Sequence, residues 1–281
     1  MSIRVTGIYR YPVKSCRGER LDASAVDPWG LAGDRRWMIV DADGSPVTGR
    51  EYPRLVLVAP SVDTSNVDNS NRVMRFTAPG MPDLTVGFPG GGESRLVPVN
   101  VWKKSSLVAA QADDEASEWL TKITGDPVRL VYLDDPTRRR VDPDYSLDTD
   151  RVSFADGFPL LMVSEASLAR LNDWIAEGPN PDAAPLPVAR FRPNVVISGA
   201  SPWQEDEWRS IRIGDVTFRS PKGSDRCVFT TVDPDTAVKG REPLVTLARH
   251  RRWAGKVWFG VNLIPDAPGT ISAGDVVEIT A

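Results

Sequence analysis

The chain has 281 residues, of which 41% are hydrophobic and 26% are charged, and its formal net charge is −4. This composition is typical of a folded globular protein, and the length allows one large or two ordinary domains. The lack of a basic excess disfavours general nucleic-acid binding. No apolar run approaches the roughly 20 residues that a membrane-spanning helix needs, so neither nucleic acid nor a membrane is an expected partner.

Cysteine and histidine usage limits the possible chemistry. Two cysteines, Cys16 and Cys227, make no disulfide framework, and the start of the chain lacks the long apolar stretch of a secretory signal, so we expect a cytoplasmic protein. The single histidine, His250, rules out a multi-histidine zinc site and is expected at the surface. Dinucleotide, P-loop and CxxC motifs are absent from the sequence, which therefore predicts no site of those kinds.

The first half of the chain reads mainly as short strands separated by proline, glycine and asparagine clusters, a pattern typical of a barrel or sandwich. The predicted strands lie at 5–13, 54–63, 72–78 and 83–88. Residues 36–50 predict a hairpin that turns at Asp43 and Gly44. The spacing of apolar residues then changes to that of an amphipathic helix over 113–125, with an aspartate to begin it and a glycine to end it.

The second half mixes strands with two further helices. The predicted strands lie at 128–133, 158–163, 194–199, 211–220, 227–232, 257–264 and 276–280. Ser164 is placed to cap a helix over 165–176, and 243–252 predicts a shorter one. The polar segment 134–151 and the proline-rich segment 177–189 are expected to be exposed loops.

Together these elements predict an α+β protein that is predominantly β, with a few helices. No internal repeat or low-complexity segment interrupts either half. The simplest division is an N-terminal β-barrel-like domain at 1–123 and a second, barrel-containing domain at 124–281 that carries most of the helices.

Cys227 stands beside Arg226 in the stretch 223–236, GSDRCVFTTVDPDT, and allows two interpretations. In the first, the thiol is a small apolar filler in a half-buried strand, which is the commoner use of a free cysteine. In the second, the neighbouring cation favours the thiolate, which is both a nucleophile and a metal ligand. These residues taken alone leave both interpretations open.

Basic and polar residues also collect where three predicted strands begin or break. The sets are Lys14, Ser15 and Arg17; Asp34, Arg35 and Arg36; and Arg192 with Asn194. Each residue could be solvated or could form one half of a surface ion pair. Brought together, they would form an anion cradle, because arginine binds phosphate through paired hydrogen bonds and lysine supplies a point charge.

Six segments resemble, in the same order, the molybdenum-cofactor-sulfurase C-terminal (MOSC) family, and within it the branch of the mitochondrial amidoxime-reducing component and its bacterial relatives. They are YPVKSCRG, GDRRWMIVDADG, VTGREYPRLVLV, SEASLARLN, FRPNVVISG, and DRCVFTTVDPDT followed by EPLVTL. The resemblance runs nearly end to end. RCVFTTVDPDT together with YPVKS is its most specific part.

The resemblance implies a pterin-dithiolene molybdenum cofactor (Mo-molybdopterin) held between a MOSC N-terminal β-barrel domain and a MOSC domain. On matching positions, Cys227 would be the molybdenum ligand and the catalytic residue, and a thiolate suits such a soft metal centre. The other implied cofactor-binding residues are Lys14, Ser15 and Arg35 at the phosphate, Arg192, Asn194, Asp156 and Ser224 at the pterin, and Arg226 beside the ligand. Asp233, in the turn after Cys227, is expected to be structural.

The sequence departs from the family at three places. Ala237 stands where many relatives have a glycine after VDPDT, which puts the shape of that turn in question. Val261 stands where relatives often carry glutamine, so a polar contact from that position is lost. The approach to the ligand at 223–225 also differs. Two cysteines are too few for the four-cysteine iron–sulfur cluster that some bacterial relatives carry in a further domain.

The residues and the resemblance predict a molybdenum-dependent oxidoreductase that reduces N-hydroxylated compounds such as amidoximes, hydroxamic acids and hydroxylamines. Two alternatives stay open: a protein that stores or hands on the cofactor without turnover, and a sulfur carrier with a persulfide on Cys227. With no flavin, nucleotide or iron–sulfur motif, the chain is expected to need a separate electron-donor protein of the ferredoxin, flavoprotein or cytochrome type. The predicted docking site is the run Arg138, Arg139 and Arg140, which could instead be only a solvated loop.

Overall fold

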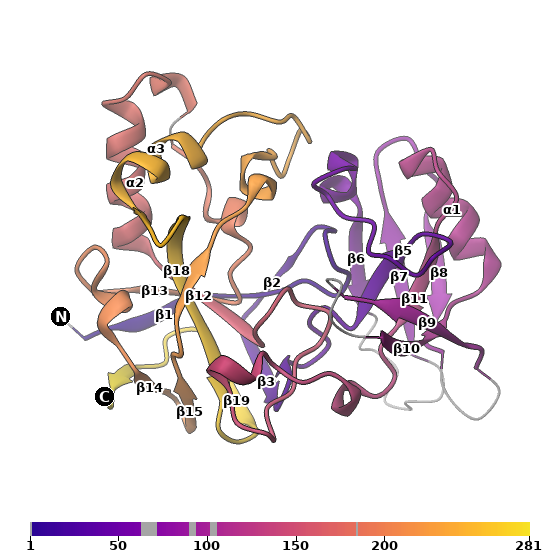
Figure 1. The fold of residues 1–281 in the computed structure, drawn as a ribbon, viewed down its shortest axis with the longest axis horizontal. Helices are drawn as coiled ribbons and strands as arrows, with labels where there is room; N and C mark the ends of the chain where they lie inside the picture. The colour runs from indigo at the N-terminus through magenta and orange to yellow at the C-terminus, as the bar shows by residue number, and fades with distance from the viewer. Residues whose placement is uncertain (1, 63–71, 90–93, 102–105, 184) are drawn as a thin grey trace.

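The structure, a computed structural model, describes residues 2–62, 72–89, 94–101, 106–183 and 185–281. Strands are its main elements, with three α-helices among the described residues, so the predicted α+β, predominantly β class is confirmed. Figure 1 shows two lobes side by side, one around the long strand β18 (Lys256–Pro265) and the other carrying the helix α1 (Asp114–Thr124).

The lobe around β18 contains a sheet of ten described strands. Its order is β2 (Glu19–Leu21), β1 (Arg4–Arg10), β13 (Val195–Ser198), β12 (Leu160–Ser164), β18, β15 (Val216–Arg219), β14 (Ser210–Ile213) and β20 (Val277–Ile279), with β16 (Gly223–Asp225) and β17 (Arg252–Trp253) also paired to β18. The strands β12 and β13 run parallel, and the other ladders of this sheet are antiparallel. The core of the lobe lies against this sheet and includes Ile8, Met162 and Phe218.

Most of the segment 2–31 belongs to this same lobe, whereas Val13 and Cys16 pack in the core of the other lobe. Besides the pairing of β1 with β13, the strands β19 (Gly269–Ser272), β3 (Ala23–Asp27) and β4 (Gly30–Leu31) form a small sheet that joins the two ends of the chain. Buried side chains of that sheet, Val26, Leu31 and Ile271, share the core of the larger sheet. The chain thus crosses between the lobes near its start as well as in its middle. The division at residue 123 stays a prediction.

The other lobe is built from two smaller sheets and α1. One sheet has the order β5 (Trp37–Val40), β11 (Arg129–Tyr132), β10 (Ser106–Gln111) and β9 (Leu96–Asn100), and the other has the order β6 (Ala59–Val62), β7 (Val73–Thr77) and β8 (Leu84–Gly87). As predicted, α1 buries one apolar face, which contains Trp119 and Leu120. The Asp113 side chain accepts a hydrogen bond from Ala116 N at 2.9 Å, and Gly125 ends the helix with a φ of 82°.

The helices α2 (Glu165–Ala176) and α3 (Leu244–His250) cover the lobe of β18 at the positions predicted for them. Leu171 and Ile175 of α2 are fully buried and form its inner face. Ser164 does precede α2, but its side chain makes no capping hydrogen bond, so that part of the prediction is wrong. Within the described ranges, no helix combines the length and the apolar character needed to cross a bilayer.

Two predicted strands are partly or wholly 3-10 helices. Residues 53–57 form the turn η1 (Pro53–Leu57), because a proline at the first helical position already has the helical φ. The predicted strand at 227–232 is the turn η8 (Val228–Thr231). Its two threonine hydroxyls donate hydrogen bonds back to the carbonyls of Cys227 and Val228, at 2.9 and 2.8 Å, and these local bonds compete with strand pairing.

The segments predicted as loops contain further 3-10 turns. These are η3 (Pro136–Arg138), η4 (Pro143–Tyr145), η5 (Pro181–Ala183) and η6 (Val188–Phe191), and η7 (Gln204–Glu207) lies between β13 and β14. The strands β2, β3, β4, β9, β10, β16, β17 and β19 were not predicted from the sequence. These strands have two to six residues each, so any alternation of apolar and polar residues in them is brief. Their conformation depends on the strands with which they pair.

Candidate functional site

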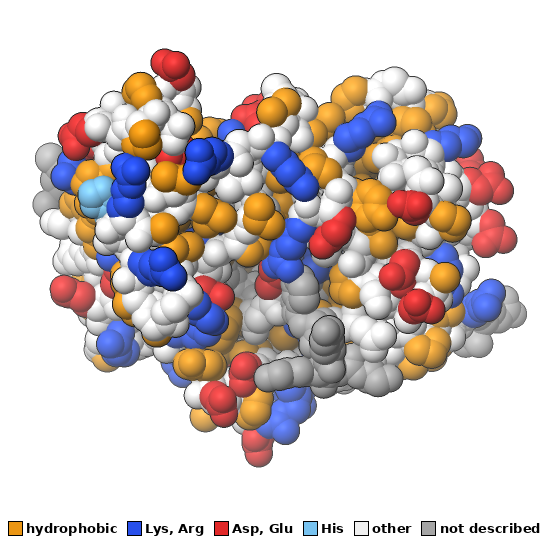
Figure 2. Space-filling view, turned by 45° about the horizontal axis from the view of Figure 1, so that its top comes forward, with side chains coloured by type: hydrophobic (Ala, Val, Ile, Leu, Met, Phe, Trp, Pro, Cys, Tyr) orange, Lys and Arg blue, Asp and Glu red, His pale blue; other side chains and the backbone are white. Residues whose placement is uncertain are grey.

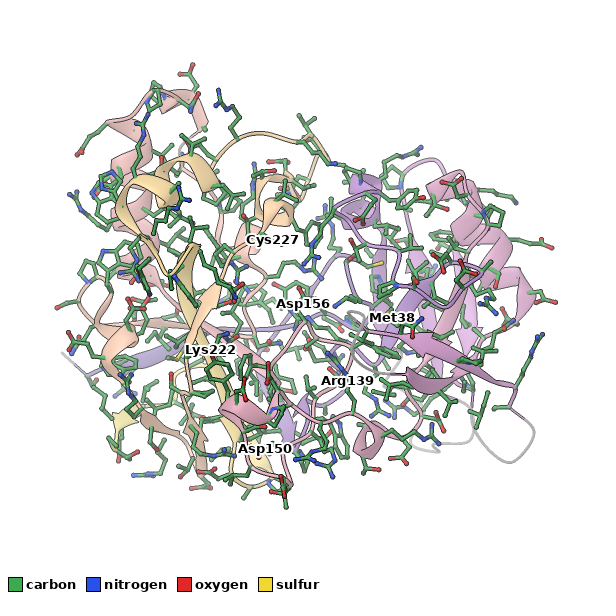
Figure 3. The ribbon with its side chains drawn as sticks, viewed as in Figure 1. Met38, Arg139, Asp150, Asp156, Lys222 and Cys227 are labelled. Carbon is green, nitrogen blue, oxygen red and sulfur yellow. The ribbon has the colours of Figure 1, made fainter. Side chains whose placement is uncertain are left out.

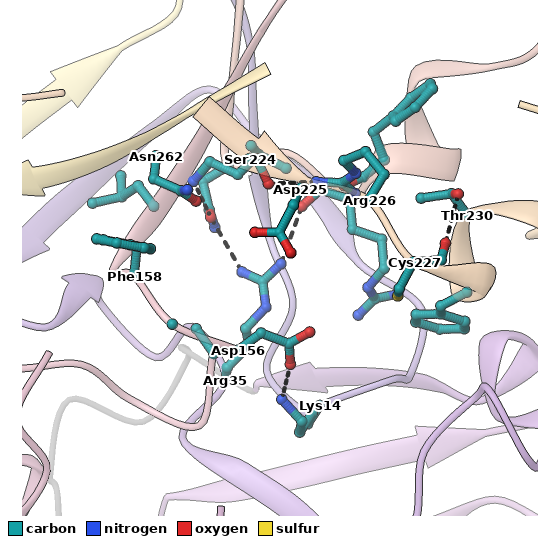
Figure 4. Close-up of a pocket in the computed structure, with 18 of the residues that line it drawn as sticks. Lys14, Arg35, Asp156, Phe158, Ser224, Asp225, Arg226, Cys227, Thr230 and Asn262 are labelled. Atoms are coloured by element: carbon teal, nitrogen blue, oxygen red, sulfur yellow. Dashed lines mark hydrogen bonds and ion pairs between the residues drawn. The ribbon is translucent and has the colours of Figure 1, made fainter. Parts of the chain in front are cut away.

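A cavity of about 400 Å³ lies where the two lobes meet. All nine side chains predicted to bind the cofactor line it, namely Lys14, Ser15, Arg35, Asp156, Arg192, Asn194, Ser224, Arg226 and Cys227. Figure 3 places Asp156 and Cys227 near the boundary between the lobes, and Figure 4 shows the labelled lining residues converging on one space. The fold therefore brings together residues that are up to 213 positions apart, from Lys14 to Cys227.

Strand ends explain this convergence. β1 is antiparallel to β13, so the end of β1, followed by Lys14, lies at the edge where β13 begins, just after Arg192 and Asn194. β12 is parallel to β13, so the segment before β12, with Asp156, reaches the same edge. β16 pairs with β18 and leads directly to Cys227.

Three of these residues hold an unfavourable backbone conformation. Ser15, Arg35 and Arg192 have φ values of 71°, 47° and 55°, and they are half of the six non-glycine residues with positive φ in the described part of the chain. Side chains with a β-carbon rarely adopt this region, and such strain is often found at functional sites. The turns that carry these residues are therefore shaped to aim side chains into the cavity.

Arg35 is held in place by three acceptors. Its Nη1 donates to Asp34 Oδ2 at 2.5 Å and to Asn194 Oδ1 at 3.1 Å. Its Nη2 donates to the carbonyl of Arg192 at 3.0 Å. Asp34 is buried and also accepts a hydrogen bond from Tyr11 N at 2.8 Å. Asp34 therefore links the loop after β1, which carries Tyr11, to the loop before β5, which carries Arg35.

Asn194 makes its hydrogen bonds inside the protein. Its Oδ1 accepts from Leu161 N at 3.2 Å as well as from Arg35, and its Nδ2 donates to the carbonyl of Tyr9 at 3.1 Å. The side chain thus ties β1 to the start of β12 and fixes Arg35. A contact from Asn194 to a pterin stays a prediction.

Tyr11 supports two guanidinium groups, and the sequence analysis missed it. Arg192 lies 4.2 Å and Arg35 4.6 Å from the centroid of its ring, and Arg192 is also 5.4 Å from the Phe229 ring. Burial lowers the pKa of Arg192 to about 10 and raises that of Tyr11 to about 12. Arg192 Nη2 is buried and has no hydrogen-bond partner among the described residues.

Lys14 and Asp156 form an ion pair in the cavity wall, which Figure 4 shows. Lys14 Nζ also donates to the carbonyl of Phe154 at 2.8 Å, and Arg50 Nη2 donates to Asp156 Oδ2 at 3.2 Å. Burial lowers the pKa of Lys14 to about 8, although the Asp156 charge opposes this. The Asp156 side chain is 61% exposed and opens onto the cavity. The surrounding protein disfavours its charged form, but Lys14, Arg50 and Arg35 outweigh this and hold the pKa of Asp156 below its usual range.

Arg139 corrects the prediction for the segment 134–151. The side chain is buried, and it donates to the carbonyl of Ala155 at 2.6 Å, to that of Asp156 at 3.1 Å and to that of Ser153. Burial lowers the pKa of Arg139 to about 10. Because three exposed arginines were expected here, that part of the prediction is wrong. Arg139 instead holds the loop that carries Asp156.

The neighbours of Arg139 are paired as well. Arg138 donates to Asp134 Oδ1 at 2.7 Å, and Arg140 donates to Asp148 Oδ1 at 2.5 Å. The run therefore presents no row of three solvated cations, which the predicted docking site required.

The two cysteines have different surroundings, and both are free thiols. Cys16 is fully buried in the core of the α1 lobe, where it packs as a small apolar side chain and burial raises its pKa to about 12. Cys227 is half-buried and lines the cavity at the start of η8. Its carbonyl accepts from Thr230 N at 3.1 Å and from Thr230 Oγ1 at 2.9 Å, which holds the turn in place.

Arg226 is fixed next to this thiol. It donates to Ser224 Oγ and to the carbonyl of Phe191, both at 2.8 Å. Burial lowers the pKa of Arg226, and the Cys227 charge opposes that change. Among the described lining residues, seven are lysines or arginines and three are aspartates, so the cavity is strongly basic in a chain of net charge −4. Such a wall suits an anionic ligand.

The sequence matches two family descriptions in succession. Residues 2–127 match the MOSC N-terminal beta barrel domain, and residues 149–278 match the MOSC domain. The chain belongs to the MOSC family. The resemblance inferred from the six segments is therefore confirmed.

Relatives cover nearly the whole of this MOSC chain. It is 32% identical to the mitochondrial amidoxime reducing component 2 of Bos taurus, over 97% of this chain and 82% of that protein. It is 31% identical to the mitochondrial amidoxime-reducing component 1 of Homo sapiens, over 98% of this chain and 82% of that protein. A molybdenum cofactor sulfurase of Oryza sativa subsp. japonica is 30% identical, over 93% of this chain and 32% of that protein.

The turn after the thiol has a left-handed residue at Ala237, where the sequence departs from the MOSC pattern. Ala237 has a φ of 60°, so it adopts the left-handed conformation that a glycine would adopt more easily. Asp233 Oδ1 accepts from the backbone N–H groups of Asp235 and Thr236, at 3.1 and 2.9 Å, which agrees with its expected structural role. Val261 is buried in the core of the β18 lobe and does not line the cavity.

Other lining residues of this MOSC protein were missed. They include Thr48, Arg50, Phe158, Arg190, Lys222 and Asn262. Tyr11 could have been found, since it directly precedes Pro12 in the specific YPVKS segment. Thr48 and Arg50 could also have been found, since they lie in the quoted segment VTGREYPRLVLV. The other four lining residues stand outside the quoted segments, so the sequence offered no signal for them.

Proposed function

We propose that this protein is a molybdenum-cofactor-dependent reductase of N-hydroxylated compounds, with the cofactor in the cavity and Cys227 as the protein ligand to molybdenum. The observation that carries the proposal is one basic cavity that holds both a half-buried thiol and an arginine with a buried, unpartnered nitrogen, Arg192 Nη2. The names of the relatives support it, since two refer to amidoxime reduction and one to the molybdenum cofactor.

The residues present fit such a cofactor. Arg192 Nη2 is buried without a partner in the described structure, and an acceptor on a bound ligand would satisfy it. Lys14, Ser15 and Arg35 would hold the phosphate, because they place two cations and a hydroxyl on one wall of the cavity. Arg192 and Arg226 would hold the pterin, and Cys227 would bind the metal through its soft sulfur.

When bound, the cofactor supplies the two-electron reduction that cleaves an N–O bond. The net reaction converts R–NHOH, two electrons and two protons into R–NH₂ and water. The chain's own residues bind and orient. Tyr11 keeps two guanidinium groups stacked on its ring, and Arg139 holds the loop of Asp156, which in turn is paired with Lys14.

The deciding experiment combines composition and turnover. The purified protein is analysed for molybdenum and for pterin, and the conversion of benzamidoxime to benzamidine is then followed with reduced methyl viologen as the electron donor. We expect about one molybdenum and one pterin per chain, with turnover. Protein that binds both but does not turn over any amidoxime, hydroxamic acid or hydroxylamine would be a cofactor carrier, and the reductase proposal would be wrong.

The sulfur-carrier alternative gives a different result in the same preparation. It predicts a persulfide on Cys227, seen as a gain of one sulfur in the mass of that peptide, with no bound pterin. A cytoplasmic location stays a prediction, since two of the relatives are named mitochondrial.

A further inference from the structure

An exposed tryptophan stands at the tip of the hairpin formed by β17 and β18. Trp253 is 47% exposed, and its ring stacks on that of Trp258 with the centroids 5.6 Å apart. The tip itself turns through Ala254 and Gly255, both with positive φ. A large aromatic ring held in a fixed position at the surface is a common centre of protein–protein contacts.

This hairpin is directly connected to the cavity wall. Trp258 pairs in register with Asp225, and Arg226 N donates to the carbonyl of Val257 at 2.8 Å. The ring of Trp258 lies 5.9 Å from Lys222 Nζ, and Lys222 and Asp225 both line the cavity. Trp258 therefore lies between the exposed Trp253 and the residues that lead to Cys227.

The stretch of chain that carries Trp253 is basic, although Asp206 from another element pairs with its Arg251. Residues 243–265 contain four lysines and arginines and the single histidine but no carboxylate, although the whole chain is acidic. Arg249, Arg252 and Lys256 of this stretch are exposed, and Figure 2 shows Lys and Arg side chains beside the histidine. Lys256 is paired with Asp225 at 3.1 Å, so part of its charge is already balanced at the cavity side.

We propose that the Trp253 surface, formed by Arg249, Arg252, Trp253 and Lys256, docks an acidic one-electron carrier protein that feeds the cavity. The proposal rests on the proposed reductase function, because a two-electron reduction then requires such a carrier to dock twice in each turnover. Charge complementarity selects an acidic partner, and the stacked tryptophans place that partner next to the wall that holds Cys227. This surface replaces the Arg138–Arg140 run, in which Arg139 is buried.

The test uses the cofactor-loaded protein and a plant-type [2Fe–2S] ferredoxin as the acidic carrier. Two double variants receive the same change in charge: Arg252→Glu with Lys256→Glu at the Trp253 surface, and Arg138→Glu with Arg140→Glu as the matched control. Ferredoxin affinity is measured by surface plasmon resonance at low and high salt. Turnover is measured both with reduced ferredoxin and with reduced methyl viologen.

We expect the Trp253-surface variant to bind ferredoxin about tenfold or more weakly at low salt and to turn over more slowly with it. Methyl viologen turnover should be unchanged, and the control variant should keep both rates. Trp253→Ala should weaken binding in the same direction without changing the salt dependence, and thermal melting checks that each variant is folded.

Three results would overturn the proposal. One is no binding of ferredoxin to the unaltered protein at low salt, and another is equal affinity in the Trp253-surface variant. The third is that the unaltered protein binds a single-stranded oligonucleotide more tightly than ferredoxin and that the Trp253-surface variant abolishes this oligonucleotide binding. That result would assign the surface to nucleic acid. If the unaltered protein shows no turnover with methyl viologen, the proposed reductase function is wrong. The docking proposal would still be tested, because the ferredoxin affinity is measured without turnover.

Discussion

The guanidinium of Arg192 lies 4.2 Å from the centroid of the Tyr11 ring, and that of Arg35 lies 4.6 Å from the same ring. One aromatic side chain thus sets the position of two cations that reach the cavity from different loops. Both arginines have a left-handed backbone conformation, which side chains with a β-carbon rarely adopt. Tyr11 is buried and carries no charge in this role, because burial raises its pKa to about 12.

This arrangement predicts that the ring of Tyr11, and not its hydroxyl, supports ligand binding. Tyr11→Phe should keep the pterin content of the purified protein, whereas Tyr11→Ala should lower it. A cation–π contact in a desolvated site is worth about 1–2 kcal/mol, or roughly a tenfold change in affinity. Equal loss in both variants would show that the hydroxyl matters instead.

The two cysteines should respond in opposite ways to substitution by serine. Cys227→Ser should abolish reductase activity and remove a sulfur ligand from the molybdenum X-ray absorption spectrum, with little change in stability, because the side chain is half-buried. Cys16→Ser should keep activity but lower the free energy of unfolding by about 1–3 kcal/mol, since it buries a hydroxyl in an apolar core. Equal loss of activity in both would indicate a shared thiol mechanism.

The anion cradle predicts a loss of cofactor occupancy when its cations are removed. Lys14→Ala and Arg35→Ala should each weaken cofactor binding by about 1–3 kcal/mol, because both contacts would be charge-assisted and partly buried. Arg17→Ala is the matched control, since Arg17 lies in the same segment but pairs with Asp235 at 3.0 Å outside the cavity lining. Full molybdenum content in the Lys14/Arg35 double variant would place the phosphate elsewhere.

A buried carboxyl far from the cavity predicts a pH dependence of stability. Glu205 is fully buried, and burial raises its pKa although Ser167 Oγ donates to it at 2.8 Å. The folded state thus favours the protonated acid. Its stabilising contribution is present below the ordinary pKa of 4.5 and is lost as the pH rises through the raised folded value.

Glu205→Gln should therefore be more stable than the parent protein at pH 7 and should show a weaker pH dependence between pH 4 and pH 8. Urea unfolding at several pH values measures both, and Asp206→Asn, at the neighbouring position, provides the comparison. A variant that is less stable at every pH would mean that the ionised carboxylate is satisfied in the folded protein.

The sequence by itself determined the family, the thiol and the nine side chains that meet in the cavity. It could do so because short motifs such as YPVKS and RCVFTTVDPDT are local and carry the site residues with them. It also determined α1, where apolar spacing, Asp113 and Gly125 all act within the helix itself. The motifs and the helix α1 depend on residues that are close together in the chain, so the sequence alone is enough to predict them.

Tertiary structure alone decided the features that depend on distant partners. Arg139 looks like one of three exposed arginines, but carbonyls 14 to 17 residues later accept its hydrogen bonds and bury it. Tyr11 becomes a platform only when Arg35 and Arg192 arrive from two other loops. The pairing of β1 with β13 likewise joins residues 187 to 194 positions apart. A hydrogen bond or ring contact between distant segments leaves no periodic pattern in the sequence, so only the folded chain shows it.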